Sequence, residues 1–353
     1  MFSRSERKLD HISNALSIGA VEKNAFDNFH FVHNSLPLTN IADIDFSVKM
    51  GELHLSSPIF INAMTGGGGE KTKEINQKLA IIAKETQMAM AVGSQKSALR
   101  NKEEKSTYKI VRKENPTGII FANIGGECNS EQAKAAVDML EANAIQVHLN
   151  VIQELTMPEG DRDFSLILKN IESIVTNSEV PVIVKEVGFG MSKDVIMRLE
   201  NSGVSYIDIG GFGGTNFATI ENKRRNKVLP FFENWGIPTP HSILEAVTFK
   251  NDTTHIIASG GIRDSLDIVK SLSMGAKCVG MAGLFLRAVH NKTLTDAVSE
   301  VKELQEEIKI IMTALGAKTV EELLMCPFVV LNESMDYLEQ REVSIKQFSL
   351  RKK

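Results

Sequence analysis

Short apolar runs recur through the middle of the chain, and most end beside glycine, serine or asparagine before a segment of mixed polarity. The segments between them repeat apolar residues at three- and four-residue spacing, which is typical of amphipathic helices. About eight β/α units over roughly 230 residues fit a (β/α)8 TIM barrel better than an open sheet, which usually has fewer strands. Strands are predicted at 58–62, 88–92, 118–122, 145–149, 180–184, 206–209, 255–258 and 277–281, and helices at 71–87, 131–143, 164–177, 193–202 and 265–273.

The pattern predicts one domain, in which residues 58–288 form the barrel. Residues 1–57 are expected to be an N-terminal extension, and residues 289–353 to be additional helices with their clearest periodicity at 304–315. Gly203 and Gly275 stand where a left-handed residue commonly ends a helix. One long connector begins at Gly210, after the sixth strand, and such loops at this barrel face are often lids.

Composition narrows the class of protein. The chain has 353 residues, of which 42% are hydrophobic and 24% charged, as in ordinary folded proteins. A net charge of −4 argues against a nucleic-acid partner. Three scattered cysteines show neither a zinc nor a disulfide pattern, and neither a secretory leader nor a membrane-spanning run is recognisable. The expected location is the cytoplasm, without a membrane partner.

Polar residues cluster where the fourth predicted strand ends. Gln146, His148 and Asn150 alternate with apolar residues and would share one face, and Gln153 and Glu154 follow on the predicted loop. An α/β barrel keeps its chemistry at this end. A carboxylate beside a neutral amide suits a divalent cation and an uncharged substrate segment. The alternative is a strand end that is merely capped by polar loop residues.

Glycine-rich segments follow four of the predicted strands. Small residues let backbone N–H groups approach a planar ring or a phosphate, and the loops after the last two strands form the usual phosphate site of this barrel. Lys185 ends an apolar strand and needs an anionic partner, which would be either the edge of a reduced flavin ring or a strand-end acid. These features predict a phosphorylated cofactor beside the segments 63–69, 210–215, 259–263 and 282–283.

Taken together, these motifs resemble type 2 isopentenyl diphosphate isomerases, which are FMN-dependent β/α barrel enzymes. The resemblance runs nearly end to end and rests on residues 7–12, 62–67, 93–95, 123–125, 148–160, 185–190, 213–225 and 259–263. It implies interconversion of isopentenyl and dimethylallyl diphosphates without net redox change. It further implies reduced FMN as the acid/base group, NADPH as its reductant, Mg²⁺, and a homo-oligomer of tetrameric or octameric form.

The resemblance also assigns roles to residues. Gln153 and His148 are the catalytic candidates, with Gln153 orienting the substrate or relaying a proton, and Glu154 would bind Mg²⁺. The diphosphate substrate would contact Arg7, Lys8, Ser94, Gln95, Lys96, His148, Asn150 and Gln153. FMN would contact Ala63, Met64, Thr65, Ser94, Asn123, Lys185, Gly210, Thr215, Gly261, Ile262, Arg263, Ala282 and Gly283.

Simpler interpretations exist for some of these residues. Arg7 and Lys8 would ordinarily be a solvated charge run, and His148 a satisfied core histidine. Gly210 and Phe212 depart from the serine and arginine usual in the family, which removes a hydroxyl expected near the flavin.

The same residues bear on competing functions. A 2-hydroxy-acid oxidoreductase of this fold needs a histidine base after the sixth or seventh strand, but residues 210–216 contain none and His255 begins its strand. A nucleotide dehydrogenase needs a cysteine in the sixth-strand loop, where none occurs. A noncatalytic scaffold would be expected to lack Gln153 and Glu154.

Overall fold

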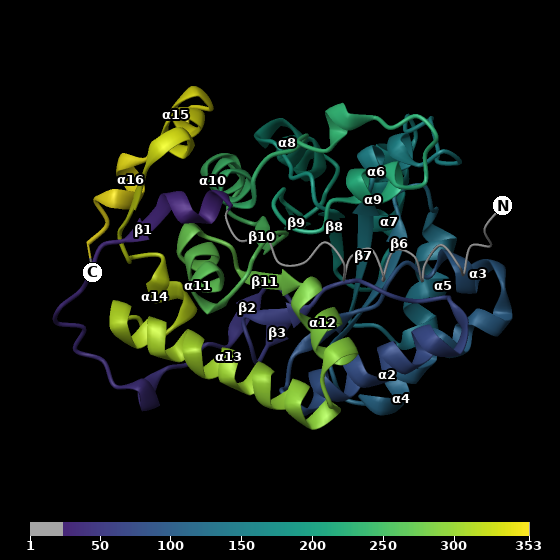
Figure 1. Ribbon diagram of the computed structural model, residues 1–353, viewed down its shortest axis with the longest axis horizontal. Coiled ribbons are helices and arrows are strands. Elements are labelled where there is room, and N and C mark those ends of the chain that lie inside the picture. The colour runs from purple at the N-terminus through teal and green to yellow at the C-terminus, as the bar shows by residue number, and fades with distance from the viewer. Residues whose placement is uncertain (1–23, 353) are drawn as a thin grey trace.

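Eight parallel strands close into a barrel in the computed structural model, which describes residues 24–352 (Figure 1). Consecutive strands are neighbours, and pairing of the last with the first closes the sheet. The barrel strands are β4 (Ile59–Ile61), β5 (Ala89–Ala91), β6 (Ile120–Gly125), β7 (Ala144–Leu149), β8 (Val182–Glu186), β9 (Tyr206–Asp208), β10 (His255–Ser259) and β11 (Cys278–Met281). The predicted fold and all eight predicted strands are therefore confirmed.

Helices surround the barrel and follow its strands. Those that alternate with strands are α2 (Gly69–Glu85), α3 (Lys96–Arg100), α4 (Ser106–Glu114), α5 (Ser130–Leu140), α6 (Val151–Thr156), α7 (Ile167–Asn177), α8 (Lys193–Asn201), α9 (Phe217–Asn222), α10 (Thr239–Phe249), α11 (Ser265–Met274) and α12 (Gly283–Asn291). The chain continues through α13 (Leu294–Leu315), α14 (Val320–Leu323), α15 (Asn332–Gln340) and α16 (Lys346–Ser349). Short 3-10 turns occupy Ala25–Asn28, Ile41–Asp43, Lys102–Lys105 and Pro230–Phe232.

The interior of the barrel is apolar in its middle and polar near the carboxyl ends of the strands. Phe60 and Phe121 are fully buried and meet edge to face, with ring centroids 5.6 Å apart. Asn62 and Asn123 lie two residues further along the same strands, on the same face. Each of these strands thus carries an aromatic ring in the core and an amide near the carboxyl end, where the interior opens.

A hairpin lies at the opposite end of the barrel. It consists of β2 (Val48–Met50) and β3 (Leu53–Leu55), whose apolar side chains are buried. At its turn, the Glu52 N–H donates to the hydroxyl of Tyr206, the first residue of β9, at 3.3 Å. This contact places the hairpin at the amino ends of the strands, so ligands enter from the carboxyl ends.

The two extensions pack against each other. The antiparallel pairing of β1 (Phe29–Phe31) with β12 (Phe328–Val330) joins the N-terminal segment, purple in Figure 1, to the yellow C-terminal segment. Residues 289–353 were predicted to contain only helices, so β12 is a correction. The strand has three residues, which is too short to produce a recognisable alternation.

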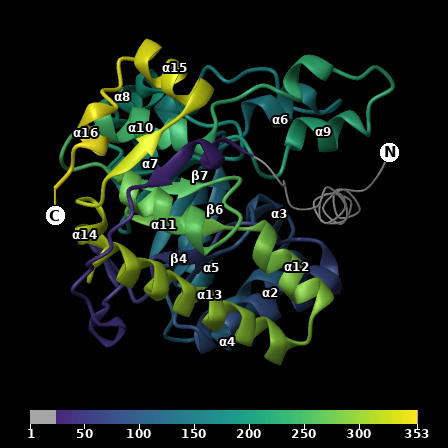
Figure 2. The same ribbon diagram turned by 60° about the vertical axis from the view of Figure 1, so that its left-hand side comes forward.

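The long connector after β9 contains α9, and α9 packs beside α6 in both views (Figure 2). Gln153 and Glu154, predicted on a loop, lie within helix α6 instead. Both predicted helix-ending glycines have positive φ, +83° at Gly203 and +121° at Gly275. None of the helices within residues 24–352 combines the length and apolar character needed to cross a membrane.

His241 couples the C-terminal helices to the barrel and makes that contact sensitive to pH. Its ring stacks on Tyr337 of α15 with centroids 4.6 Å apart, and Nε2 is 2.8 Å from the hydroxyl of Ser334. Burial lowers the pKa of His241 from 6.5 to about 4, and the nearby carboxylates of Glu245 and Glu333 only partly oppose this. The folded protein therefore holds this ring neutral.

We expect the free energy of unfolding to fall as pH drops from about 6.5 to about 4, because the unfolded chain takes up a proton on His241 that the folded chain does not. This residue accounts for up to about 3 kcal/mol. Urea titrations across that range test it, since His241→Gln should flatten the pH dependence. An identical slope in the wild type and the variant would contradict this assignment.

Candidate functional site

A large cavity of about 390 Å³ opens at the carboxyl ends of the strands. It brings together segments that follow all eight barrel strands, as the topology requires. Within residues 24–352, every predicted site residue lines this cavity except Gln95. Arg7 and Lys8 lie outside the described residues.

Gln95 points away from the cavity. Its side chain is fully buried, accepts the N–H of Asn123 at 2.9 Å and donates to the carbonyl of Ala136 at 2.9 Å. Both ends of the amide are thus engaged in joining β6 to α5. This placement does not fit the predicted substrate contact and gives Gln95 a structural role in holding Asn123.

His148 lines the cavity from the end of β7. Its Nδ1 lies 2.9 Å from Oδ1 of Asn123 on the neighbouring strand. Burial lowers the pKa of His148 to about 4, although the carboxylate of Glu127 opposes the shift. The ring is therefore neutral near neutral pH. His148 is hydrogen-bonded, as the simpler interpretation required, but it also faces the cavity.

Gln153 and Glu154 occupy the first turn of α6. Nδ2 of Asn150 donates to Oε1 of Glu154 at 3.0 Å, and the N–H of Asp161 donates to Oε2 at 2.8 Å. Each carboxylate oxygen accepts one of these bonds, and a carboxylate oxygen has more than one lone pair. Glu154 can thus also coordinate a cation.

Gln153 is tied to the connector above it. Its Nε2 donates to Oε1 of Glu221 on α9 at 3.4 Å, and Glu221 is fully buried. Arg224 bridges Glu221 and Glu159, so α9 is held to the segment that follows α6. Because a carboxylate accepts, this contact directs the amide oxygen of Gln153 away from Glu221.

Lys185 is 6% exposed and reaches the cavity from the end of β8. Its ammonium donates to the backbone carbonyl of Glu186 at 2.7 Å, in place of the strand-end ion pair considered as the alternative. The neutral carbonyl and the carboxyl of Glu186, whose pKa burial raises to about 7, compensate this buried positive charge only in part, which favours an anionic ligand nearby.

Glu186 is a cavity residue that the sequence did not single out. Its Oε2 accepts the N–H groups of Gly188 and Phe189, at 2.6 and 2.5 Å. Burial raises the pKa of Glu186 to about 7 despite these donors. The carboxyl of Glu186 therefore holds the glycine-rich turn after β8, and its raised pKa lies close to neutral pH.

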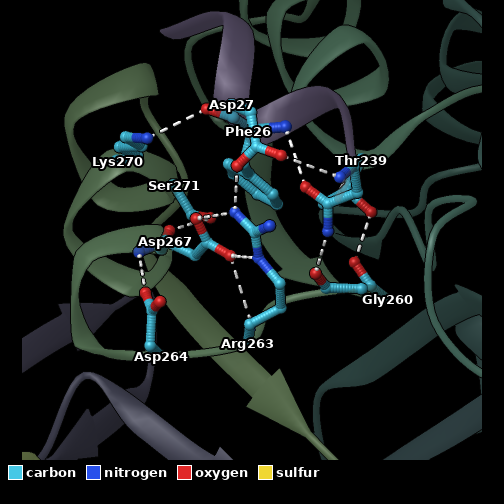
Figure 3. A network of polar contacts seen from close by, with 11 residues as sticks. Phe26, Asp27, Thr239, Gly260, Arg263, Asp264, Asp267, Lys270 and Ser271 are labelled. Atoms are coloured by element: carbon cyan, nitrogen blue, oxygen red, sulfur yellow. Dashed lines mark hydrogen bonds and ion pairs between the residues drawn. The ribbon is translucent and has the colours of Figure 1, made fainter. Parts of the chain in front are cut away.

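Arg263 is enclosed by acids where the loop after β10 meets the N-terminal segment (Figure 3). Its Nε donates to Asp267 at 2.7 Å and its Nη2 donates to Asp27 at 2.7 Å. Hydrogen bonding to Asp267 is the main reason that the pKa of Arg263 is raised. The side chain lines the cavity, but in this arrangement it stabilises the loop that presents Gly260 and Gly261.

Three features characterise the part of the cavity wall that is formed by the segments after β10 and β11 and by α2. Gly260 and Gly261 both line the cavity and have positive φ, +92° and +67°, and without side chains they let a ligand approach the backbone closely. Gly283 opens α12, so the helix N-terminus faces the cavity beside Arg287. On α2, Thr72 is one of the residues around the cavity, and its buried hydroxyl has no hydrogen-bond partner within the described residues.

Several lining residues had no sequence signal of their own. Arg287 and Thr72 lie inside ordinary amphipathic helices, where a cavity-facing polar residue looks like a solvent-facing one. Glu127 follows β6, and Lys96 pairs with it across the cavity rim. Lys96 was predicted from the sequence, whereas Arg287, Thr72 and Glu127 could have been found only by knowing that the barrel closes.

Comparison with known proteins places the chain in a family. The model of the FMN-dependent dehydrogenase family matches residues 100–326, which is more than half of the chain. An isopentenyl-diphosphate delta-isomerase of Bacillus cytotoxicus is 54% identical over 349 residues, covering 99% of this chain and 100% of the relative. One from Bacillus cereus is 56% identical over 348 residues, covering 99% of each.

The chain belongs to the type 2 isopentenyl diphosphate isomerase family. The resemblance carried by the motifs is thereby confirmed. A solved lactate oxidase of Pediococcus acidilactici superposes with a TM-score of 0.65 at 15% identity, covering 92% of this chain and 87% of that one, and shows the shared fold alone.

The competing functions considered for this fold would require a histidine or a cysteine at particular places in the cavity. Among the described residues, His148 on β7 is the one histidine that lines it, whereas His255 stands at the start of β10, beside Tyr206. Cys128, Cys278 and Cys326 are buried and none lines the cavity. The arrangements considered for a hydroxy-acid oxidoreductase and a nucleotide dehydrogenase are thus missing from residues 24–352.

The backbone around Gly210 leaves no room for a side chain. Its φ is +44°, and a Cβ there would lie 2.1 Å from the backbone oxygen of Glu186. We therefore expect Gly210→Ala to destabilise the protein by clearly more than the roughly 1–2 kcal/mol of a left-handed non-glycine residue. The free energy of unfolding in urea gives the measurement.

Gly69→Ala is the matched control, because Gly69 has φ of +71° but no atom within 4 Å of the position that a Cβ would take. It should lose only the conformational contribution. Equal losses in the two variants would show that the contact with Glu186 is not the cause.

Proposed function

We propose that the cavity interconverts isopentenyl diphosphate and dimethylallyl diphosphate, using reduced FMN and Mg²⁺. The observation that supports this most strongly is that one cavity joins a glycine-lined anion site, near Gly261 and Gly283, to the Gln153–Glu154 pair. A flavin and a diphosphate substrate can therefore share the same space. The relatives of similar sequence carry the same activity in their names.

The residues present fit FMN. The N-terminus of α12 and the backbone at Gly260 and Gly261 offer N–H donors to a phosphate. Lys185 offers a buried cation to an electron-rich ring, and Thr72 an unused hydroxyl. Reduced FMN would supply the acid/base chemistry beside the substrate alkene. NADPH is the proposed reductant.

The residues also fit Mg²⁺ held jointly with the substrate. Within residues 24–352, no three His, Cys, Asp or Glu side chains are grouped so as to hold a metal alone. Mg²⁺ commonly binds through one or two carboxylates together with substrate phosphates and water. Glu154 suits this role because Asn150 and Asp161 orient its carboxylate toward the cavity region that it lines.

The cavity that Glu154 lines has charged side chains, which would contact the diphosphate, and apolar side chains, which would contact the rest of the substrate. Lys96 and Arg287 bring positive charge to the cavity, with Arg7 and Lys8 proposed to add more. The apolar remainder of the substrate would meet Met157, Phe217 and Leu284, which line the same cavity. Such a surface excludes water, which would otherwise trap a developing carbocation.

Gln153 is proposed to position the reacting group. A neutral amide is not a strong base, but it can orient a substrate or relay a proton by hydrogen bonding. Its bond to Glu221 restricts the amide to one orientation, and Arg224 holds Glu221 in turn. We further propose a tetramer or octamer, as in the family that the motifs resemble.

The purified protein is expected to be yellow and to isomerise isopentenyl diphosphate only when Mg²⁺ is present and the flavin is reduced. Product analysis after reduction with NADPH or dithionite tests this. Omission of Mg²⁺ and omission of reductant are the controls. Net oxidation of a substrate, with electrons passed to an acceptor in every turnover, would refute the isomerase proposal in favour of a hydroxy-acid oxidoreductase.

Glu154 and Gln153 should fail in different ways although they are adjacent. Glu154→Gln keeps the shape of the side chain but loses the charge, so the Mg²⁺ concentration for half-maximal activity should rise about tenfold or more. Gln153→Ala should lower kcat about tenfold or more, with little change in the Mg²⁺ requirement. Steady-state kinetics over a Mg²⁺ series separate the two effects. An unchanged Mg²⁺ dependence in Glu154→Gln would remove the ligand assignment.

A further inference from the structure

Three buried amides form a continuous chain of hydrogen bonds across the top of the barrel interior. They belong to Asn62, Gln146 and Asn123 and are called the amide relay below. The three side chains are 4%, 0% and 2% exposed, so water cannot satisfy them and the protein must. The relay ends at His148, the histidine of the cavity.

The orientation of the Asn62 amide is fixed because one of its partners can only donate a hydrogen bond and the other accepts one. The N–H of Ala63 donates to Oδ1 of Asn62 at 2.8 Å, and a backbone N–H cannot accept. On the other side, Nδ2 of Asn62 donates to Oδ2 of Asp208 at 2.9 Å. A donor on one side and a carboxylate on the other require the same orientation of Asn62.

Asp208 is well suited to anchor the chain. It is fully buried at the end of β9, and its Oδ1 accepts both the N–H of Gly210 at 3.2 Å and the hydroxyl of Ser259. Together with Asn62, three donors converge on its two oxygens. The carboxylate therefore acts as an acceptor throughout.

The orientation of Asn62 passes along the relay without ambiguity. Oδ1 of Asn62 accepts from Nε2 of Gln146 at 3.0 Å, which leaves Oε1 of Gln146 for Nδ2 of Asn123, also at 3.0 Å. Oδ1 of Asn123 then faces Nδ1 of His148 at 2.9 Å. Since an amide oxygen can only accept, Nδ1 must carry the proton.

We propose that the amide relay holds neutral His148 as the Nδ1–H tautomer, leaving the Nε2 lone pair for the cavity. Gln146 and Asp208, which the cavity chemistry does not otherwise use, are positioning residues in this proposal. It rests on the proposed function only for what occupies the cavity, because the tautomer follows from contacts within the protein.

The tautomer limits what His148 can do. In this state Nε2 accepts a hydrogen bond from a hydroxyl group or a water molecule, and it cannot donate to an anionic diphosphate oxygen without first taking up a second proton. The predicted contact between neutral His148 and an ionised diphosphate would therefore run through a bridging water molecule or a protonated phosphate oxygen.

The decisive measurement is the ¹⁵N spectrum of histidine-labelled, FMN-loaded protein near neutral pH. Long-range ¹H–¹⁵N correlations distinguish a protonated ring nitrogen from an unprotonated one. The chain has 8 histidines, and the His148→Gln spectrum identifies the signals of interest. We expect a protonated Nδ1 and an unprotonated Nε2 for His148. The Nε2–H tautomer in the wild type would overturn the proposal.

A matched pair of variants tests whether the relay is the cause. Gln146→Met keeps a similar shape but removes the acceptor for Asn123, so the ratio of the two His148 tautomers should fall about fivefold or more. Protonated Gln146→Glu keeps an acceptor oxygen facing Asn123 and a hydroxyl donor facing Oδ1 of Asn62, and it should preserve the tautomer. An unchanged ratio in Gln146→Met would show that the relay does not control His148.

The tautomer of His148 can be determined even if one variant does not fold or the protein is not an isomerase. Gln146→Leu replaces the methionine variant if the latter does not fold, and the wild-type spectrum alone already decides which tautomer is present. Wild-type protein with Nδ1–H but without isomerase activity would refute the proposed function and leave the relay standing. An active isomerase with Nε2–H would do the reverse.

Discussion

Closure of the parallel sheet, completed by pairing of β11 with β4, is the constraint on which the rest of the structure depends. Because all eight strands run in one direction, their carboxyl ends meet around one opening. Segments more than 200 residues apart in the chain, such as those that carry Ala63 and Gly283, become neighbouring parts of the wall of one cavity. If the sheet did not close, the glycine-rich turns and the Gln153–Glu154 pair would not face a common cavity.

Burial of polar groups at this opening gives the cavity its chemical character. Lys185 carries a charge beside a neutral carbonyl, the pKa of Glu186 is raised by burial, and the pKa of His148 is lowered by it. Each group is held by backbone or amide partners that leave part of its capacity for a ligand. Such groups are costly in an apolar core, and they cluster here at the binding end of the barrel.

The connector after β9 links the two halves of the proposed chemistry. Its first residues, including Gly213 and Thr215, line the side proposed for the flavin, and its helix α9 holds Gln153 through Glu221. A change in the position of α9 would therefore be felt at both the proposed cofactor and substrate sides. This coupling follows from hydrogen bonds between α6 and α9 rather than from any motif in either segment.

The sequence by itself determined the eight strands, most of the helices, the family and the glycine-rich and polar segments that line much of the cavity. Those features depend on local periodicity, on glycines at strand ends and on motifs that lie within a few residues of one another. It did not reveal β12 or the helical setting of Gln153 and Glu154, because short elements leave no periodic signal, and it did not show that Gln95 points away from the cavity toward α5. Nor could it show that Asp208, Asn62 and Gln146 join into a relay to His148. Those contacts cross between strands, and only closure of the barrel decides which polar side chains share its interior.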